Sequence, residues 1–203
     1  MGTGSTVRQA TAADRDPLIA AFAAAALDEA VTVWILHGHP ADRFLAGWVP
    51  DLIDKALCED EIWIAEADGS IRAVSLWQTV TSVDRHAAEA AELRAAADAA
   101  PEVSALRRAA YVTSLLAREH PREFPHRYLQ VIVTVPEHRG KGAGGAILTD
   151  RLKAASDASI PAFLEASTQR SARLYTRKGF VREGHTHTLP EDGPTLIPMW
   201  FRG

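Results

Sequence analysis

The sequence predicts a single domain of mixed α and β structure, in which a central sheet of about six to seven strands is flanked by helices. Three observations support this fold class. Runs with period-two apolar alternation are interleaved with stripes of helical spacing along the chain. The 203 residues contain no fixed-period repeat and no low-complexity linker, so residues 1–203 are expected to form one domain. With 47% hydrophobic and 24% charged residues, the composition is that of a globular protein.

The first 80 residues are predicted to form a short strand, two helices and a hairpin. Val7–Gln9 has strand character, and Thr11 or Asp14 caps an alanine-rich helix that reaches about Leu27. A second helix is predicted over residues 41–57, with a kink near Pro50. Asp68-Gly69 separates two strand-like runs, residues 61–66 and 71–78, which is a strong hairpin signal.

Two further helices are predicted in the middle of the chain. Residues 84–100 have high helical propensity, and Pro101 is expected to open the next helix, with Val103, Leu106 and Ala110 on one face. From Tyr128 the period becomes two, and Leu129, Val131, Val133 and Val135 are expected to point to one side of a strand. The remaining predicted elements are a helix after the glycines at 140–145, a strand at 162–166, a helix at 169–178, and strands at 181–187 and 196–201.

Charge and composition exclude several classes of function. The formal net charge is −4 and no basic run stands out, which argues against a nucleic-acid partner. The longest apolar run, residues 18–27, is too short to span a bilayer, and Asp14 and Asp16 do not fit a signal peptide. Cys58 is the only cysteine, which predicts a reducing compartment and a cytoplasmic protein; we expect Cys58 to be a small buried hydrophobe.

Four glycines, at positions 140, 142, 144 and 145, separate a hydrophobic strand from an amphipathic helix. Glycine lacks a Cβ, so the backbone can bend tightly and approach a ligand closely. The N–H groups that open the helix, together with the positive end of its dipole, favour an anion at this point. Residues 139–145 therefore predict a binding site for a phosphate or a pyrophosphate.

Two nucleotide-binding motifs compete for this loop. Gly140, Gly142 and Gly145 have the G-x-G-x-x-G spacing of dinucleotide-binding folds. Gly145 lies late in the chain, however, and too few residues remain for the βα units that a doubly wound fold needs after its first turn. A P-loop requires Ser or Thr after its Gly-Lys pair, where this sequence has Gly142. Nucleotide-dependent chemistry is therefore disfavoured.

The run from Arg139 to Gly144 resembles the coenzyme A signature of the GNAT superfamily of N-acetyltransferases. That signature is Gln or Arg, two residues, Gly, one residue, and then Gly or Ala. Residues 175–180, Tyr-Thr-Arg-Lys-Gly-Phe, are similar to the family's Tyr-x-x-x-Gly-Phe element. The resemblance implies a GNAT fold with a partly splayed mixed sheet, acetyl-coenzyme A (acetyl-CoA) as cosubstrate, and direct acetyl transfer to a primary amine.

A narrower resemblance is to puromycin N-acetyltransferase and its actinobacterial relatives. It rests on the loop, on Ala73–Trp77 and on Pro161–Ser167, and it covers residues 61–80 and 120–182. The stretch 31–50 has no such match, so the resemblance says more about the identity of the cofactor than about that of the acceptor. We expect the acceptor to be a small molecule such as an antibiotic or an amino metabolite. Ser171 stands where the puromycin enzyme has asparagine; serine can still donate and accept, so contact with the cofactor is expected to remain.

The resemblance implies the following cofactor-binding set. The backbone of Val133 and Val135 would bind the pantetheine amides, because in relatives this strand splays from its neighbour and leaves ladder groups free. Arg139 and Lys141 would add positive charge beside the pyrophosphate. The full set is Val133, Thr134, Val135, Arg139, Gly140, Lys141, Gly142, Ala143, Gly144, Gly145 and Ser171.

The resemblance also implies two catalytic side chains. Tyr175 would protonate the departing sulfur, a modestly uphill transfer because a phenol titrates near ~10 and a thiol near ~8.5. Glu165, at the end of a strand, would be the general base if burial or a bridging water raises its basicity. A structural role for Glu165 is an equal alternative. His126 is a second candidate base, and His37 and His39 are further candidates to face the acceptor.

The acceptor side and the partners follow less directly from the sequence. Trp34, Trp48 and Trp77 are candidates to line an acceptor cleft, with Trp77 the strongest of them. His185 and His187 alternate on a predicted strand, but two ligands without a third do not indicate a metal site, so none is expected. We expect a monomer or a homodimer. A protein lysine or N-terminus as acceptor, and a non-catalytic acyl-CoA sensor, are the alternative functions.

Overall fold

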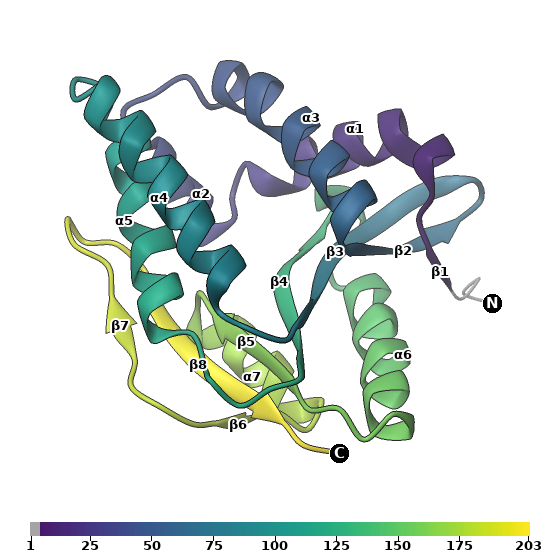
Figure 1. The fold of residues 1–203 in the computed structure, drawn as a ribbon. Helices are drawn as coiled ribbons and strands as arrows, with labels where there is room; N and C mark the ends of the chain where they lie inside the picture. Colours follow the sequence, from purple (N-terminus) through teal and green to yellow (C-terminus); the bar gives the residue numbers. More distant parts are fainter. Residues whose placement is uncertain (1–4) are drawn as a thin grey trace.

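The computed structural model describes residues 5–203 (Figure 1). Its strands are β1 (Thr6–Gln9), β2 (Glu61–Ala67), β3 (Ser70–Val80), β4 (His126–Thr134), β5 (Ala162–Ala166), β6 (Val181–Arg182), β7 (His187–Thr188) and β8 (Thr195–Phe201). Its α-helices are α1 (Arg15–Ala26), α2 (Ala30–Leu36), α3 (Ala41–Glu59), α4 (Asp84–Ala99), α5 (Ser104–Glu119), α6 (Ala143–Asp157) and α7 (Gln169–Arg177). Short 3₁₀ helices, η1 (Ala12–Asp14) and η2 (Pro136–His138), precede α1 and the glycine loop.

The strands form one mixed sheet in the order β1-β2-β3-β4-β5-β8-β6, with β7 paired to β8. All neighbours are antiparallel except β4 and β5, which run parallel. The predicted mixed α/β fold is confirmed. The strand expected over 181–187 is broken into β6 and β7, because the chain bends between them at Gly184, whose φ is +102°.

Helices cover both faces of the sheet, as Figure 1 shows for α1 and α3 above it and α6 below. Alternate residues of β3 divide between the two sides. Val74 and Leu76 pack in the core with α1 and α3, whereas Ala73 packs against α6 and Trp77 against its far end. The period-two pattern of the sequence therefore corresponds to a sheet that is buried on both faces.

The sequence missed one helix and misplaced the start of another. α2 (Ala30–Leu36) was not predicted, because its β-branched residues have low helical propensity; the Glu29 side chain caps it by accepting from the Thr32 N–H at 2.9 Å. Pro101 does not open α5. It lies in a turn closed by the Val103 N–H, which donates to the Ala100 carbonyl at 3.0 Å, and the helix begins at Ser104.

A β-bulge in β4 corrects the expected facing of its side chains. The register with β3 pairs Leu76 with Val131 but Trp77 with Leu129, so Gln130 is the extra residue. Leu129 consequently points to the α6 side, while Val131 and Val133 pack on the α1–α3 side. Val135 lies beyond the end of the strand. The prediction that these four residues share one face was wrong at Leu129.

The structure also bears on the exposure of Cys58 and on whether any helix could span a membrane. Cys58 is exposed near the end of α3, not buried, because the last turn of that helix presents it to solvent. Within residues 5–203, no single helix is long and apolar enough to cross a bilayer. Only Ala12–Ala26 and Ala30–Leu36 together pass such a test, by length and composition, and they meet at a bend of 80°.

Candidate active site

The site begins where β4 and β5 separate. Their parallel pairing consists of two residue pairs, Arg127 with Ala162 and Tyr128 with Phe163. Beyond Tyr128, β4 continues to Thr134 paired with β3 alone, so its other edge carries no partner strand among the described residues. An unpaired strand edge presents N–H and C=O groups that a ligand can bind.

A cavity of about 400 Å³, here the central cavity, opens along this edge. Its walls come from the middle of β4, the end of β5, the first turns of α7, the segment that joins α1 to α2, and side chains of α2, α3 and α5. It brings together five residues that the sequence singled out separately: Trp48, Val133, Glu165, Ser171 and Tyr175. The last four converge because β4, β5 and α7 meet at the point of separation.

Glu165 occupies the fourth position of β5, partly buried beside the central cavity. Burial raises the pKa of its carboxyl to about 7, even though a hydrogen bond from the Tyr128 hydroxyl favours the ionised form. A carboxylate with a pKa in that range is a far better base than an exposed one. The burial that the sequence argument required is therefore present.

Tyr175 lies on α7 with 8% of its surface exposed, against the edge of the Phe180 ring at 5.8 Å between centroids. Burial raises the pKa of its phenol above the ordinary value, and the negative charge of Glu29 across the cavity adds to the effect. The hydroxyl consequently stays protonated at neutral pH. A protonated donor of this kind can give its proton only to a strongly basic group.

The glycine loop follows β4 through η2 and leads into α6. Gly140 and Gly142 have φ values of +72° and +90°, which only glycine adopts without strain. Gly142 is the N-cap of α6, and no side chain caps the helix there. The N–H groups of the first turn have no intrahelical acceptor, so they and the helix dipole are available to an anion.

Two nearby contacts shape this loop. A Cβ at Gly144 would lie 3.1 Å from the Thr134 side-chain oxygen, so glycine allows the helix start to approach the strand closely. Lys178, which the sequence analysis did not assign to the site, holds its ammonium 3.8 Å from where a Cβ of Gly145 would lie and donates to Thr149 at 2.6 Å. Its position three residues after Tyr175 was the only signal in the sequence.

The arginine of the loop does not face the first turn of α6. The Arg139 guanidinium forms an ion pair with Asp28, at 2.7 Å for Nη2–Oδ1, and donates to the Thr134 carbonyl at 3.1 Å and to the Ala25 carbonyl. It therefore ties the glycine loop to the C-terminal end of α1. Lys141 is exposed and Ala143 is buried at the start of α6.

The backbone N–H and C=O of Val135 were expected to be free, but both are hydrogen-bonded within the protein. Its N–H donates to the Arg72 carbonyl at 2.9 Å, and its carbonyl accepts from the His138 N–H at 2.9 Å. Both groups are used because the chain turns into η2 immediately after β4. Val133 pairs with Val74 in the same ladder, two residues away, so its N–H and C=O also face β3, although the residue lines the central cavity.

The histidines of the sequence analysis lie away from the central cavity. His126 is fully buried; its Nδ1 donates to the Glu123 carbonyl at 2.7 Å, and burial lowers its pKa. It is not among the cavity's wall residues, nor are His37 and His39, the latter bonded to Ser104 at 2.7 Å. Across residues 5–203, no three or more His, Cys, Asp or Glu side chains are grouped so as to hold a metal ion.

Of the three tryptophans, only Trp48 lines the cavity. Trp77, predicted as the strongest candidate, is 1% exposed and donates to Ser75 within the core on the α6 side. Trp34 is also buried and donates to the Pro190 carbonyl at 2.8 Å. Trp48 projects from α3, and 40% of its surface is exposed.

Comparison with known proteins agrees with this geometry. Residues 73–202 match the family model described as acetyltransferase (GNAT) domain. A histone acetyltransferase-related protein from Corynebacterium glutamicum is 25% identical, with 98% of this chain and 96% of that one covered and a TM-score of 0.68.

Two insect enzymes share the fold at lower identity. The arylalkylamine N-acetyltransferase 2 of Aedes aegypti has a TM-score of 0.75 at 16% identity, covering 98% of each chain. The Drosophila melanogaster polyamine N-acetyltransferase, which forms N-acetylagmatine, has a TM-score of 0.70 at 16% identity, with coverage of 98% and 100%. Because the family model spans well over half of the sequence, including β4, the glycine loop and Tyr175, the chain belongs to the GNAT family of acetyltransferases.

Proposed function

We propose that this protein transfers the acetyl group of acetyl-CoA to the primary amine of a small molecule. One observation carries the proposal: Glu165 and Tyr175 line one cavity on the unpaired edge of β4, close to the uncapped start of α6. The first can accept a proton near neutral pH and the second can donate one. Members of this family use acetyl-CoA, and related folds acetylate small amines.

The cosubstrate would extend from α6 to the central cavity. Its diphosphate would bind the N–H groups of the loop from Gly140 to Gly145, with Lys178 and Lys141 supplying positive charge. Its pantetheine arm would pair with the open edge of β4 next to Thr134, with Val133 and Ser171 in the wall of the central cavity. Val135 and Arg139 would act indirectly, because their polar groups already bind protein atoms.

Direct transfer accounts for both catalytic side chains. The ammonium of the acceptor loses a proton to the Glu165 carboxylate, and the free amine attacks the thioester carbonyl carbon. The C–N bond forms, the C–S bond breaks, and the sulfur takes a proton from the Tyr175 hydroxyl. The nitrogen of the new amide then loses its remaining extra proton, which restores the Tyr175 hydroxyl through solvent. Because burial raises the pKa of that phenol, the transfer must accompany C–S cleavage, when negative charge on sulfur is greatest.

The acceptor proposed here includes aminonucleosides, which the puromycin-like resemblance implies, and other amino metabolites. A lysine peptide is the test of the protein-acceptor alternative. We expect thiol release from acetyl-CoA with small amines at a higher kcat/KM than with the peptide. The reverse ranking would contradict the small-molecule assignment.

Binding can be tested without knowing the acceptor. Thermal unfolding with acetyl-CoA, NAD or ATP should show a rise in Tm of about 5–10 °C with acetyl-CoA alone, at a hundredfold excess over its Kd. Gly144→Val should abolish that shift, because the larger side chain would meet Thr134 and displace the helix start. A shift with NAD or ATP alone would contradict the proposal.

Turnover separates an enzyme from a sensor. Tyr175→Phe and Glu165→Gln should each lower kcat by about 10²–10⁴-fold while the Kd for acetyl-CoA changes little. The matched control is Tyr111→Phe, an exposed tyrosine on α5 outside the central cavity. If Tyr175→Phe retains full turnover, Tyr175 is not the proton donor; if the wild-type protein binds acetyl-CoA but acetylates no amine, it is a sensor.

A further inference from the structure

A second cavity, here the distal cavity, adjoins the central one. It has a volume of about 390 Å³ and lies between α3 on one side and α4 and α5 on the other. The two cavities share five wall residues: Thr32, Ile35, Trp48, Leu52 and Gln130. Gln130 is the bulged residue of β4, so the irregularity of that strand lies where the cavities meet.

A large part of the wall of the distal cavity is apolar. Ile35 and Leu36 of α2, Leu52 of α3, and Leu93 and Leu106 of α4 and α5 form its walls. Such a surface favours a hydrocarbon chain, at about 25 cal/mol for each Å² of apolar surface removed from water. The central cavity alone holds the reacting groups, so an apolar extension beside it has room for the body of an acceptor.

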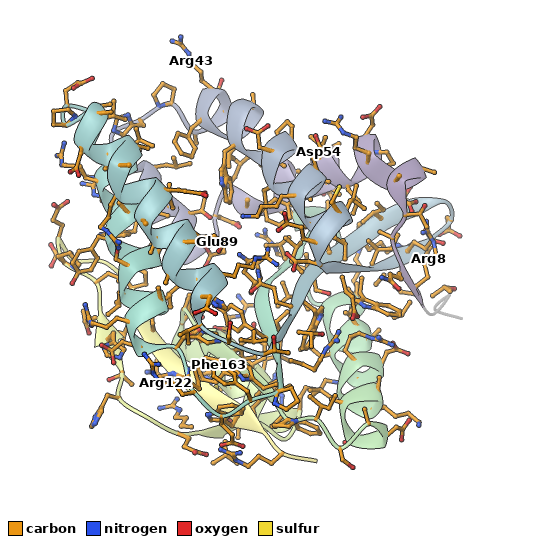
Figure 2. All side chains as sticks on the ribbon, in the orientation of Figure 1. Arg8, Arg43, Asp54, Glu89, Arg122 and Phe163 are labelled. Atoms are coloured by element: carbon orange, nitrogen blue, oxygen red, sulfur yellow. The ribbon has the colours of Figure 1, made fainter. Side chains whose placement is uncertain are left out.

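The walls of the distal cavity also carry more negative than positive side chains. Four carboxylates line it, Asp51, Asp60, Glu89 and Glu92, against two cations, Lys55 and Arg85. The cations are already engaged. Arg85 binds Asp60 through two bonds of 2.6 and 2.7 Å, and both cations bind Glu89, which Figure 2 shows on the side of α4 that faces α3.

Two carboxylates remain without a cation. Asp51 on α3 and Glu92 on α4 are exposed at the cavity, and neither forms an ion pair with any residue in the range 5–203. The charges of Asp60 and Glu89 are balanced by those of Lys55 and Arg85, so two negative charges in the cavity wall have no cation beside them. A ligand that ends in a cation would complement them.

An aromatic side chain at the junction gives an independent indication of the same ligand. Trp48 lines both cavities and leaves 40% of its surface exposed. Its ring contacts Phe22 and Phe44, with centroids 6.2 and 6.5 Å away, which hold it at the passage. A tryptophan face attracts an ammonium group that passes over it.

We propose that the acceptor is an elongated amine with two cationic ends that spans both cavities. This inference rests on the proposed function. One primary amine reaches Glu165 in the central cavity, an apolar linker lies along Trp48 and Leu52, and the second cation lies between Asp51 and Glu92. Amines that carry a distal carboxylate are poor acceptors, because that group would lie beside two unpaired acids of the same charge.

Matched probes test the distal cation. We would compare 1,6-diaminohexane, hexylamine and 6-aminohexanoate, which share a six-carbon chain and differ only at the far end. The expected order of kcat/KM is diamine, then monoamine, then amino acid. The double substitution Asp51→Asn with Glu92→Gln should lower the preference for the diamine over hexylamine by about three- to tenfold. Asp98→Asn, an exposed acid on α4 outside both cavities, is the control and should leave that preference unchanged.

The outcomes distinguish this inference from the proposed function. Equal use of diamine and monoamine, or a preference that the double substitution does not change, overturns the inference and leaves acetyl transfer intact. If no amine is acetylated, the proposed function fails. Calorimetric binding of 1,6-diaminohexane to the protein, with and without the double substitution, then tests the distal site alone: unchanged affinity in the variant would overturn it.

Discussion

At the scale of a single residue, Glu165 illustrates how burial changes chemistry. An exposed glutamate titrates near ~4.3 and is a poor base for an ammonium. In the wall of the central cavity the pKa of this carboxyl is about 7, because burial disfavours its charged form. The hydrogen bond from Tyr128 acts in the opposite direction, so Tyr128 lowers the pKa that burial alone would give this carboxyl.

The first prediction concerns this tuning. Tyr128→Phe removes a hydrogen bond that favours the carboxylate, so the pKa of Glu165 should rise further. The acid limb of the kcat/KM profile, expected near pH 7 in the wild type, should move to higher pH, with a severalfold loss at pH 7 that is recovered near pH 9. Profiles are measured with one amine for both proteins, so that the ionisation of the substrate cancels. Tyr111→Phe is the control, and a limb that moves to lower pH would contradict the assignment.

At the scale of an element, a glycine at a helix start and a glycine in a helix interior behave oppositely. Gly142 has a left-handed conformation at the N-cap of α6. Gly47 lies in the exposed interior of α3, with no positive φ and with open space where a Cβ would lie. Glycine is required at the first position, whereas at the second it only weakens the helix.

The second prediction compares these two positions. Gly47→Ala should stabilise the protein by about 0.5–1 kcal/mol, and Gly142→Ala should destabilise it by about 1 kcal/mol. For a chain of this length each kcal/mol corresponds to about 2–4 °C in Tm, which calorimetry resolves. Gly142→Ala should also weaken acetyl-CoA binding, and Gly47→Ala should not. Equal effects at both positions would show that the φ of Gly142 has no structural consequence.

At the scale of the whole molecule, a column of three histidines joins α4, the end of α5 and the start of β4. The rings of His86 and His120 stack at 4.0 Å, and His120 Nε2 lies 3.0 Å from His126 Nε2. His126 Nδ1 donates to a carbonyl, so in the neutral ring its Nε2 accepts and His120 donates. Burial lowers the pKa of His120 to about 3, and the pKa values of the other two also fall.

The third prediction follows from these lowered pKa values. Because the folded state disfavours protonation, the column's contribution to stability is present above the unfolded histidine pKa of ~6.5 and is lost as pH falls towards 3. Urea unfolding should therefore give a decreasing free energy of unfolding from pH 7 to pH 4.5. His120→Leu should reduce this slope, and His185→Leu, at an exposed position, should not. An identical slope in His120→Leu would contradict the prediction.

The strand, the glycine loop and the helix from residue 126 to 157 could be predicted from the sequence because their residues are contiguous. A period-two strand, four glycines and a helix predict an anion site by local rules alone, and the site needs few partners from elsewhere. The hairpin at Asp68-Gly69 follows from the same kind of signal: both residues have positive φ and join β2 to β3. The bulge at Gln130 carries no such signal, since an extra residue in a strand depends on the pairing with its neighbour.

The sequence by itself predicted the fold class and the glycine loop, because periodicity and spacing are properties of neighbouring residues, and its resemblance to a known family implied roles for Tyr175 and Glu165. Only the tertiary structure decided which groups share a cavity. In the folded chain, Trp48 of α3 and Gln130 of β4 line the same two cavities, whereas Trp77 and His126 line neither of them. The Arg139 side chain forms an ion pair with Asp28. The physical reason is that burial, pKa and cavity shape depend on contacts between residues distant in the chain, which no local pattern specifies.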